Sequence, residues 1–380
     1  MTLLAVLAVS ILGILALPYL CYLVLYVSIR PRGSPADKEA VEPTVSILLP
    51  TYNEEGIIQT KLDDLLELDY PMERVELVVV DSSTDDTPDT VREYFADRDV
   101  PSLTLIEEDD RGGVARAVNR AMRSITSDVV FRTDCDSKLA PDAMREAVAN
   151  LAADGVSAVT GRQSDVLGDS DVEQDYRDMI ARVQALESYL DSTFICHGPC
   201  FAFERTAFRD IAPDSLADDT EIGVNIRRDG GRVVMDPAVR FVESGVSGFT
   251  QRRTRKDRRA MGLIQLLVRN RDALGDYGRY GRVVLPFNWW FMVVSPWLAV
   301  LSGLAVTAAA VSLGSVAGAI VPLAAVGFFW LGQRDRLGPV QPLYAVVDAQ
   351  ASLLIAQVRL TLTDATGTWD VDRESRRAFE

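Results

Sequence analysis

Residues 128–139, DVVFRTDCDSKL, begin as an apolar run and end in two aspartates that are separated by one residue. The β-branched and aromatic run is typical of a strand buried in a sheet, which we predict at residues 128–134. In extended backbone, residues i and i+2 point the same way. Asp134 and Asp136 are therefore predicted to face one site at the end of this strand. Such a pair is either a solvated turn or a pair of oxygen ligands for a hard metal ion.

The same strand pattern occurs three more times upstream, in TVSILLP (44–50), VELVVVD (75–81) and LTLIE (103–107). Apolar residues recur at helical spacing in 54–68, in 86–96 and from residue 113 onward. Strands that alternate with helices indicate an α/β fold, with a Rossmann-like, mostly parallel sheet covered by helices on both faces. Ligands of such sheets bind at the carboxyl ends of strands, and here the acidic stretches PTYNEE, DSSTDDT and DCDS follow three of the strands.

The composition is strongly acidic. The 380 residues carry a net charge of -16, and only four of the 39 basic residues are lysines. A surface rich in carboxylates and poor in lysine suits high salt, where charge repulsion is screened, so we expect a halophilic archaeon as the source. An acidic protein from a GC-rich bacterium is the alternative. The acidity argues against nucleic acid as a partner. The four cysteines lack metal-ligand spacing, and no disulfide framework is expected.

Residues 3–29 contain no charged side chain and exceed the roughly 20 apolar residues that span a bilayer. Arg30 and Arg32 follow this stretch, whereas no positive charge precedes it. The positive-inside rule therefore places the N-terminus outside and the chain from residue 30 onward in the cytoplasm. We predict an N-terminal membrane anchor at residues 1–30 and a linker at 31–43.

A second apolar block at 283–332 is long enough for two membrane helices, with a turn at SLGS (312–315). The stretch 339–362 is apolar but carries Asp348, Gln350, Gln357 and Arg359, which favours an interfacial helix over a fourth span. Without a fourth span, the tail 363–380 is cytoplasmic. The predicted protein is thus a multi-pass protein of the cell membrane that contacts membrane lipids, with a cytoplasmic domain at residues 44–270.

The domain resembles a known family. The segments that carry the resemblance, in order, are VSILLPTYNEE, VVVDSSTDDTPD, RGGVARAVNRAM, FRTDCDS, CHGPCFAFERTAF and LADDTEIGVNIRRDG. Their order and spacing are similar to those of family 2 glycosyltransferases, over about residues 44–262. The resemblance implies a GT-A fold and inverting sugar transfer. The flanking apolar helices look like those of membrane-bound members such as polysaccharide synthases.

The resemblance also implies a nucleotide-sugar donor, foremost a UDP-linked one, and Mg2+ or Mn2+ bound by Asp136 and Asp134. Such a metal would neutralise the donor diphosphate. The family positions that would hold the nucleotide and sugar are here Pro50, Tyr52, Glu54, Asp81, Arg111, Asn119, Gly198 and Arg258. Val114 stands where the family usually has lysine, and Arg111 or Arg116 can replace that charge.

The segment LADDTEIG (216–223) places Asp219 at the family's catalytic carboxylate. A hydroxyl acceptor must lose its proton as the new bond forms, and an aspartate can accept that proton. A helix N-cap role competes for Asp218 or Asp219. His197, the only histidine, is expected to shape the sugar or acceptor pocket rather than to act as the base. Gly198 beside it would let a ligand approach the backbone closely.

The segment RKDRRAMG (255–262) stands where membrane-bound members show QxxRWxxG. Arg258 and Gly262 match, while Arg255 and Arg259 replace the glutamine and the tryptophan. In processive synthases that tryptophan stacks under the growing sugar chain, so its absence weakens a processive interpretation. The basic run also suits a face on anionic lipid, and Arg258 can contact a diphosphate or a lipid-linked phosphate.

These observations predict an inverting, metal-dependent glycosyltransferase at the cytoplasmic face of the membrane. It would transfer sugar to a lipid-linked acceptor or a growing cell-surface glycan. Three alternatives stay open: a processive polysaccharide synthase, a polyprenyl-phosphate glycosyltransferase that needs no base, and a non-catalytic scaffold that binds nucleotide sugars.

Overall fold

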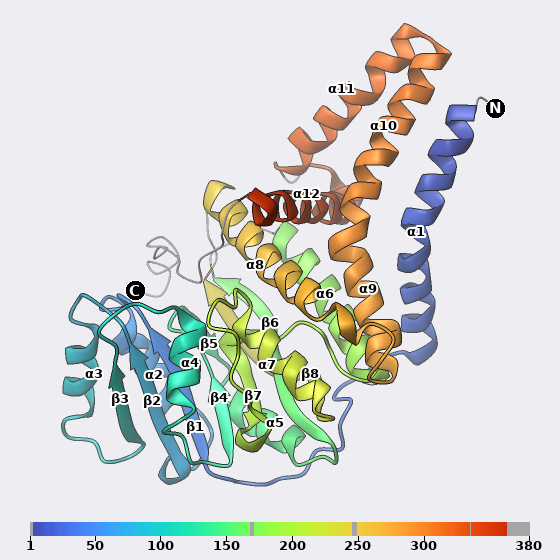
Figure 1. The fold of residues 1–380 in the computed structure, drawn as a ribbon. Helices are drawn as coiled ribbons and strands as arrows, with labels where there is room; N and C mark the ends of the chain where they lie inside the picture. The colour runs from blue at the N-terminus through green and yellow to red at the C-terminus, as the bar shows by residue number, and fades with distance from the viewer. Residues whose placement is uncertain (1–2, 168–170, 245–248, 335, 363–380) are drawn as a thin grey trace.

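The computed structural model describes residues 3–167, 171–244, 249–334 and 336–362 (Figure 1). The predicted cytoplasmic tail at 363–380 lies outside the described residues. Within them, a sheet domain is joined through a layer of helices to a bundle of long apolar helices. The sheet edge and the layer of helices between the two parts are therefore the regions that matter for function.

The sheet has eight strands in the order β3-β2-β1-β4-β7-β6-β8-β5. The strands are β1 Val45–Thr51, β2 Val75–Asp81, β3 Ser102–Glu107, β4 Val129–Arg132, β5 Ser137–Leu139, β6 Val156–Leu167, β7 Phe201–Glu204 and β8 Arg232–Ser244. The four predicted strands form its parallel half, β3-β2-β1-β4. In the other half, β7 is antiparallel to β4 and β6, and β5 is antiparallel to β8. The predicted α/β fold with a mostly parallel sheet is therefore confirmed.

Helices cover both faces of this sheet, which explains why its central strands are apolar throughout. The helices nearest the strands are α2 Ile58–Leu66, α3 Thr87–Phe95, α4 Val114–Ala121, α5 Ala143–Leu151 and α7 Asp218–Arg228. In β1, Ile47 and Leu49 pack into one core with α2 and α5. Leu48, which points the other way, packs into a second core with α4 and α7. The two cores hold the strand ends rigidly at one edge.

Among the described residues, three helical stretches are long and apolar enough to cross a membrane, namely Leu3–Ile29, Tyr280–Leu313 and Gly338–Leu362. The first is α1. The second runs without a break through η5 Tyr280–Val284, α9 Leu285–Trp289, η6 Trp290–Val294 and α10 Ser295–Leu313. The chain then turns at Gly314, whose φ of 142° suits glycine, and returns as α11 Ser315–Gly332. The turn thus lies inside the predicted segment 312–315. Figure 1 shows α1, α10 and α11 extending together away from the sheet.

Helix α12, Gln341–Leu362, runs crosswise to α1, α10 and α11 and packs on α8, Phe249–Arg269 (Figure 1). Asp348 and Gln350 on this helix have hydrogen-bond partners. The carboxylate of Asp348 accepts from Arg253 at 2.8 Å and from Lys256 at 3.2 Å, both on α8. Gln350 accepts from the hydroxyl of Ser295 at 2.9 Å. This orientation is the one expected of an interfacial helix, although α12 is also long enough to span, so the number of spans stays a prediction.

Candidate active site

A cavity of about 1060 Å³ lies at the sheet edge and extends between the helices that join the two parts of the molecule. Most of the predicted site residues line it: Pro50, Tyr52, Glu54, Arg111, Asp134, Asp136, Gly198, Asp219 and Arg258. Segments far apart in the sequence therefore meet at one place. Asp81 and Asn119 are not among the residues that line this cavity.

The two aspartates of the DCDS segment lie in a turn and not in a strand. β4 ends at Arg132, so the predicted strand at 128–134 is two residues too long at this end. Inside the turn, the hydroxyl of Ser137 donates to the carbonyl of Asp134 at 2.7 Å, and the Lys61 ammonium donates to the Ser137 carbonyl at 2.7 Å. Both carboxylates reach the same cavity, but through this turn rather than through the alternation of an extended chain.

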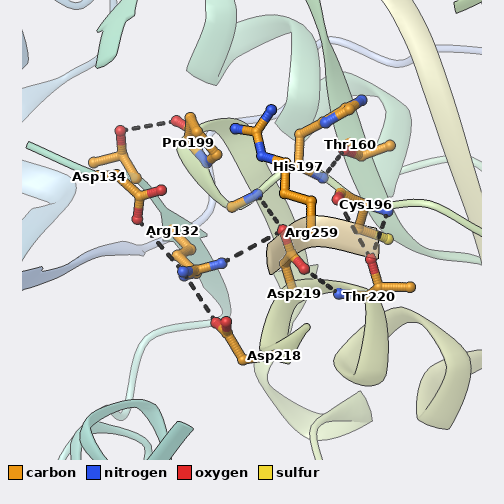
Figure 2. Close-up of polar contacts among 12 residues, drawn as sticks. Arg132, Asp134, Thr160, Cys196, His197, Pro199, Asp218, Asp219, Thr220 and Arg259 are labelled. Atoms are coloured by element: carbon orange, nitrogen blue, oxygen red, sulfur yellow. Dashed lines mark hydrogen bonds and ion pairs between the residues drawn. The ribbon is translucent and has the colours of Figure 1, made fainter. Parts of the chain in front are cut away.

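Arg132 connects the acidic segments, and the sequence analysis missed it. Its guanidinium Nη2 lies 3.0 Å from Asp218 and 3.4 Å from Asp134, while Nη1 lies 3.9 Å from Asp219 (Figure 2). The Arg132 side chain is 5% exposed. A buried charge needs a partner of opposite sign. An arginine at the end of the apolar run VVFR was therefore a signal that this strand ends among carboxylates.

Several aspartate side chains lie close together at this end of the cavity. Burial raises the pKa of Asp134 to about 6, Arg132 opposes this rise, and the charge of Asp136 adds to it. Burial likewise raises the pKa of Asp218. Arg132 from β4 and Arg255 from α8, which pairs with Asp136, supply positive charge to these carboxylates.

The residues present fit a divalent cation only together with a ligand. Among the described residues, no group of three or more His, Cys, Asp or Glu side chains could hold a metal ion. Asp134 and Asp136 supply two hard oxygen donors, and Mg2+ sites are commonly built from one or two carboxylates plus substrate phosphates. Asp136 accepts from Arg255 at 2.9 Å, so this arginine already supplies positive charge at the same place.

Asp219 lies in the first turn of α7, with both carboxylate oxygens fixed. One oxygen accepts from the backbone N–H of Thr220 at 2.6 Å and the other from that of Gly198 at 2.7 Å (Figure 2). The first bond is to the amide of its own helix, and the second ties α7 to the loop before β7. The side chain is 22% exposed and lines the cavity. The carboxylate is thus held at the helix N-terminus and is accessible to a ligand at the same time.

His197 also lines the cavity. Burial lowers its pKa to about 4, and the nearby positive charge of Arg259 adds to this effect. Its Nε2 lies 3.2 Å from the side-chain oxygen of Gln184 on α6, Asp171–Leu190. A neutral imidazole that hydrogen bonds to Gln184 fits the expectation that His197 shapes the pocket.

Where the cavity meets the loop after β1, Arg111 covers one face of Tyr52, with its Cζ 3.6 Å from the ring centroid. This cation–π contact leaves the opposite face as the one on which a base could stack. Asp81, in contrast, is 2% exposed and forms hydrogen bonds within the loops. Its carboxylate accepts from the Thr51 hydroxyl at 2.5 Å and the Ser83 hydroxyl at 2.7 Å. Asp81 therefore supports the two loops beside the cavity.

Asn119 has a structural place as well. Its side-chain amide donates to the carbonyl of Ile211 at 2.8 Å and accepts from the N–H of Ile211 at 3.0 Å. This pair of bonds pins α4 to the loop before α7. Val114, which stands where the resembled family usually has lysine, lines the cavity, and so does Arg111.

Helix α8 brings cations to the cavity. Arg255 bonds to Asp136, and Arg259 donates to Glu243 at 2.7 Å, so the residue that replaces the family's tryptophan is held in an ion pair. Arg258 lies between them in sequence and lines the cavity. The contacts of Asp348 described above attach the same helix to α12. α12 and the DCDS turn thus hold α8 from two directions.

Comparison with known proteins agrees with this geometry. Residues 46–212 match the family described as Glycosyl transferase family 2. The solved mannosyltransferase PcManGT from Pyrobaculum calidifontis, in complex with GDP-Man and Mn2+, is similar over 94% of this chain and 98% of that chain, with a TM-score of 0.80 and 29% identity. The family match covers less than half of the chain, and together with the structural similarity it indicates a glycosyltransferase with a GT-A-like fold.

Two curated proteins show more limited similarity. An N-acetylglucosaminyltransferase of Rhizobium meliloti is 29% identical over 212 residues, which are 53% of this chain and 49% of that protein. A beta-monoglucosyldiacylglycerol synthase of Nostoc sp. is 28% identical over 136 residues, 36% of this chain and 29% of that protein. The chain thus matches about half or less of the length of these relatives.

Proposed function

We propose that this family 2 domain transfers a sugar from a nucleotide-sugar donor to an acceptor at the cytoplasmic face of the membrane, with inversion at the anomeric carbon. One observation carries the proposal: Asp219, Asp134 and Asp136 face a single cavity that Tyr52 and Glu54 also line. A carboxylate held at a helix N-terminus, a pair of hard oxygen donors and an aromatic ring are the groups that such a transfer uses.

The proposed step replaces one bond at the anomeric carbon by another and transfers one proton. The acceptor oxygen attacks the anomeric carbon from the face opposite the diphosphate, so the configuration inverts. The bond between that carbon and the phosphate oxygen breaks, and its electron pair leaves with the nucleotide diphosphate. The hydroxyl proton passes to the carboxylate of Asp219, which two backbone N–H groups hold in place.

Asp134 and Asp136 would hold Mg2+ or Mn2+ together with the donor diphosphate. A divalent ion there supplies positive charge that stabilises the leaving group. The crowding of carboxylates described above supports this assignment, as does the Mn2+ in the PcManGT complex. Arg258 would contact the diphosphate from α8, because it lines the same cavity.

The sequence favours a UDP-linked donor, while the solved relative contains GDP-Man, so both nucleotides belong in the test. The experiment measures nucleotide release by the full-length protein in lipid nanodiscs, from UDP-glucose, UDP-N-acetylglucosamine and GDP-mannose. We expect one donor to be consumed with Mn2+ or Mg2+ and none with a chelator. If no donor is bound or consumed under any metal condition, the proposal is wrong. Binding without any turnover would indicate the non-catalytic scaffold.

For the acceptor, we propose a lipid-linked molecule or a growing cell-surface glycan. The name of the Nostoc relative describes a glycolipid product, which supports a lipid. Position 259 carries an arginine paired with Glu243 and therefore offers no aromatic platform, which disfavours a processive synthase. Product length in purified membranes would separate single addition from polymerisation. Transfer to polyprenyl phosphate stays the second candidate, and it is distinguished by its independence from Asp219.

A further inference from the structure

The cavity has two ends of different chemistry. The end at the sheet edge carries the acidic and basic groups described above. The other end is lined by apolar side chains, among them Val183 of α6, Phe287 of α9, Phe291 of η6 and Leu353 of α12. A nucleotide sugar consists of polar groups that form hydrogen bonds, and apolar walls cannot satisfy them. The apolar arm of the cavity, defined by these four residues, therefore requires an occupant other than the donor.

This apolar arm lies among the helices that lead away from the sheet domain. Phe287 and Phe291 belong to the continuous stretch Tyr280–Leu313, which is long and apolar enough to cross a membrane. Tyr19 of α1 also lines the cavity, and its hydroxyl lies 3.0 Å from that of Ser295 at the start of α10. One cavity thus runs from Asp219 to two helical stretches that are long enough to span the bilayer.

The carboxylate of Glu187, beside the arm, is already satisfied by the protein. Glu187, which lines the cavity, accepts from the side-chain amide of Asn288 at 2.6 Å. Its second oxygen accepts from the N–H of Phe194 at 3.0 Å and from the hydroxyl of Thr193 at 3.1 Å. A carboxylate with three protein partners does not require a polar ligand. The arm therefore suits a hydrocarbon better than a sugar chain, which would bring many hydroxyls into it.

We propose that the apolar arm binds the hydrocarbon chain of a lipid acceptor and thereby places the reacting oxygen of its head group beside Asp219. This inference rests on the proposed function and specifies where the acceptor binds. Burial of the chain would supply binding energy remote from the reaction, which orients the head group for in-line attack. It also explains why the cavity continues past the acidic cluster toward the membrane helices.

A photolabelling experiment tests the site in the unmodified protein. The probe is a dodecyl β-D-glucoside with a diazirine at the chain end, bound to the full chain in nanodiscs. We expect label on the peptides of α6, α9–η6 and α12 that line the arm. Alkyl glucosides should displace the probe, with the half-effective concentration falling roughly three- to fourfold for each added CH2, as burial of one methylene predicts. Label confined to the outer faces of α1, α10 and α11 would overturn the inference.

A matched pair of variants tests whether the arm itself is occupied. Ala349 lines the cavity on α12, whereas Ala351 does not. Ala349→Phe should lower the label yield in the arm at least tenfold and flatten the dependence on chain length, while Ala351→Phe should leave both unchanged. Equal labelling of the two variants would contradict the proposal. If Ala349→Phe fails to fold, judged by its elution profile, the labelling map of the wild type still decides. Donor turnover by the wild type, measured separately, shows whether the proposed function holds when the lipid site does not.

Discussion

Gly198 and Arg132 lie so close together that Gly198 has no room for a side chain. A Cβ on Gly198 would be 2.7 Å from Cζ of Arg132 and closer still to Nη1. The guanidinium is almost fully buried and is paired with Asp218 at 3.0 Å. The backbone N–H of Gly198 also donates to Asp219 at 2.7 Å. The absence of a side chain therefore lets the buried cation and the predicted base share one small space.

Gly198→Ala should lower the transfer rate roughly 100-fold, the loss associated with a misplacement of about 1 Å in an active site. The added methyl group pushes Arg132 away from its carboxylate partners, while the backbone at this position does not require glycine for its φ. The measurement is the rate of nucleotide release under saturating donor, beside the melting temperature.

A double-mutant cycle with Arg132→Met identifies the cause of that loss. Once the guanidinium is absent, the further change Gly198→Ala should cost little, so the two effects should be strongly non-additive. Additive losses would mean that Gly198 acts through the ligand or the backbone and not through Arg132.

Asp136→Ala should abolish metal-dependent turnover, because it removes one of the two hard oxygen donors at the proposed diphosphate site. The rate is titrated against Mn2+ for both proteins. Asp142→Ala is the matched control, since Asp142 is 45% exposed and pairs with Arg240 at the surface. If Asp136→Ala keeps a normal rate and a normal metal dependence, Asp136 is not a metal ligand.

The parallel half of the fold is readable from sequence because its strands are buried on both faces. The run 75–81 coincides with β2, and β1 is displaced by one residue from its predicted range. Strands β5 to β8 were not predicted, since their pairings, antiparallel except for that of β6 with β8, join segments far apart in the chain and local periodicity does not encode partners. The length of β4 was overestimated because the turn after it is held by Lys61, a contact over 70 residues distant.

The candidate site also contains residues that the sequence motifs predict and residues that they do not. Asp134, Asp136 and Asp219 were found from motifs and do line one cavity. Arg132 was missed although it lies within the segment FRTDCDS, because only the two aspartates of that segment were assigned a role, whereas a buried arginine demands partners. Asn119, by contrast, matches a motif position but bonds to a backbone segment that no local pattern reveals.

The buried Glu187 predicts a stability that depends on pH. Burial raises its pKa to about 7, above the ordinary value near 4.5. The folded state therefore holds this proton more tightly than the unfolded state. The stabilisation is complete below about pH 4.5 and is lost as pH rises through about 7, by up to about 3 kcal/mol.

Glu187→Gln removes the titrating group and keeps its shape. The melting temperature of the wild type minus that of Glu187→Gln should therefore fall between pH 5.5 and pH 8.5. A constant difference across this range would show that Glu187 has an ordinary pKa in the folded protein.

The topology prediction places the N-terminus outside and the sheet domain in the cytoplasm. Val100 is 49% exposed in the loop before β3, so Val100→Cys offers an accessible thiol. In intact cells a membrane-impermeant maleimide should leave this thiol unlabelled, and it should label it after lysis. Cys21 is exposed on α1 and is replaced by serine first. Labelling at position 100 in intact cells would overturn both the topology and the use of a cytoplasmic donor.

Asp219→Asn should fold, bind donor and lose transfer to a hydroxyl acceptor by roughly 10²- to 10⁴-fold, the span for removal of a general base. The side chain keeps its size but cannot accept a proton. The asparagine side chain has only one acceptor oxygen, whereas both carboxylate oxygens of Asp219 accept hydrogen bonds. The N–H of either Gly198 or Thr220 therefore loses its hydrogen bond. We therefore expect a stability loss of about 1–3 kcal/mol beside the loss of rate.

The transfer rate and the donor dissociation constant together assign the role of Asp219. Asp229→Asn, at the other end of α7, is the matched control and should behave as the wild type, because Asp229 pairs only with Arg209 among the ion pairs of the described residues. A near-normal rate for Asp219→Asn would exclude this residue as the base. It would favour a phosphate acceptor, which is already ionised and needs no base. Joint loss of donor binding and rate would instead make Asp219 part of the donor site. Loss of rate with donor binding intact is the outcome that a general base requires, because only the proton transfer has then been removed.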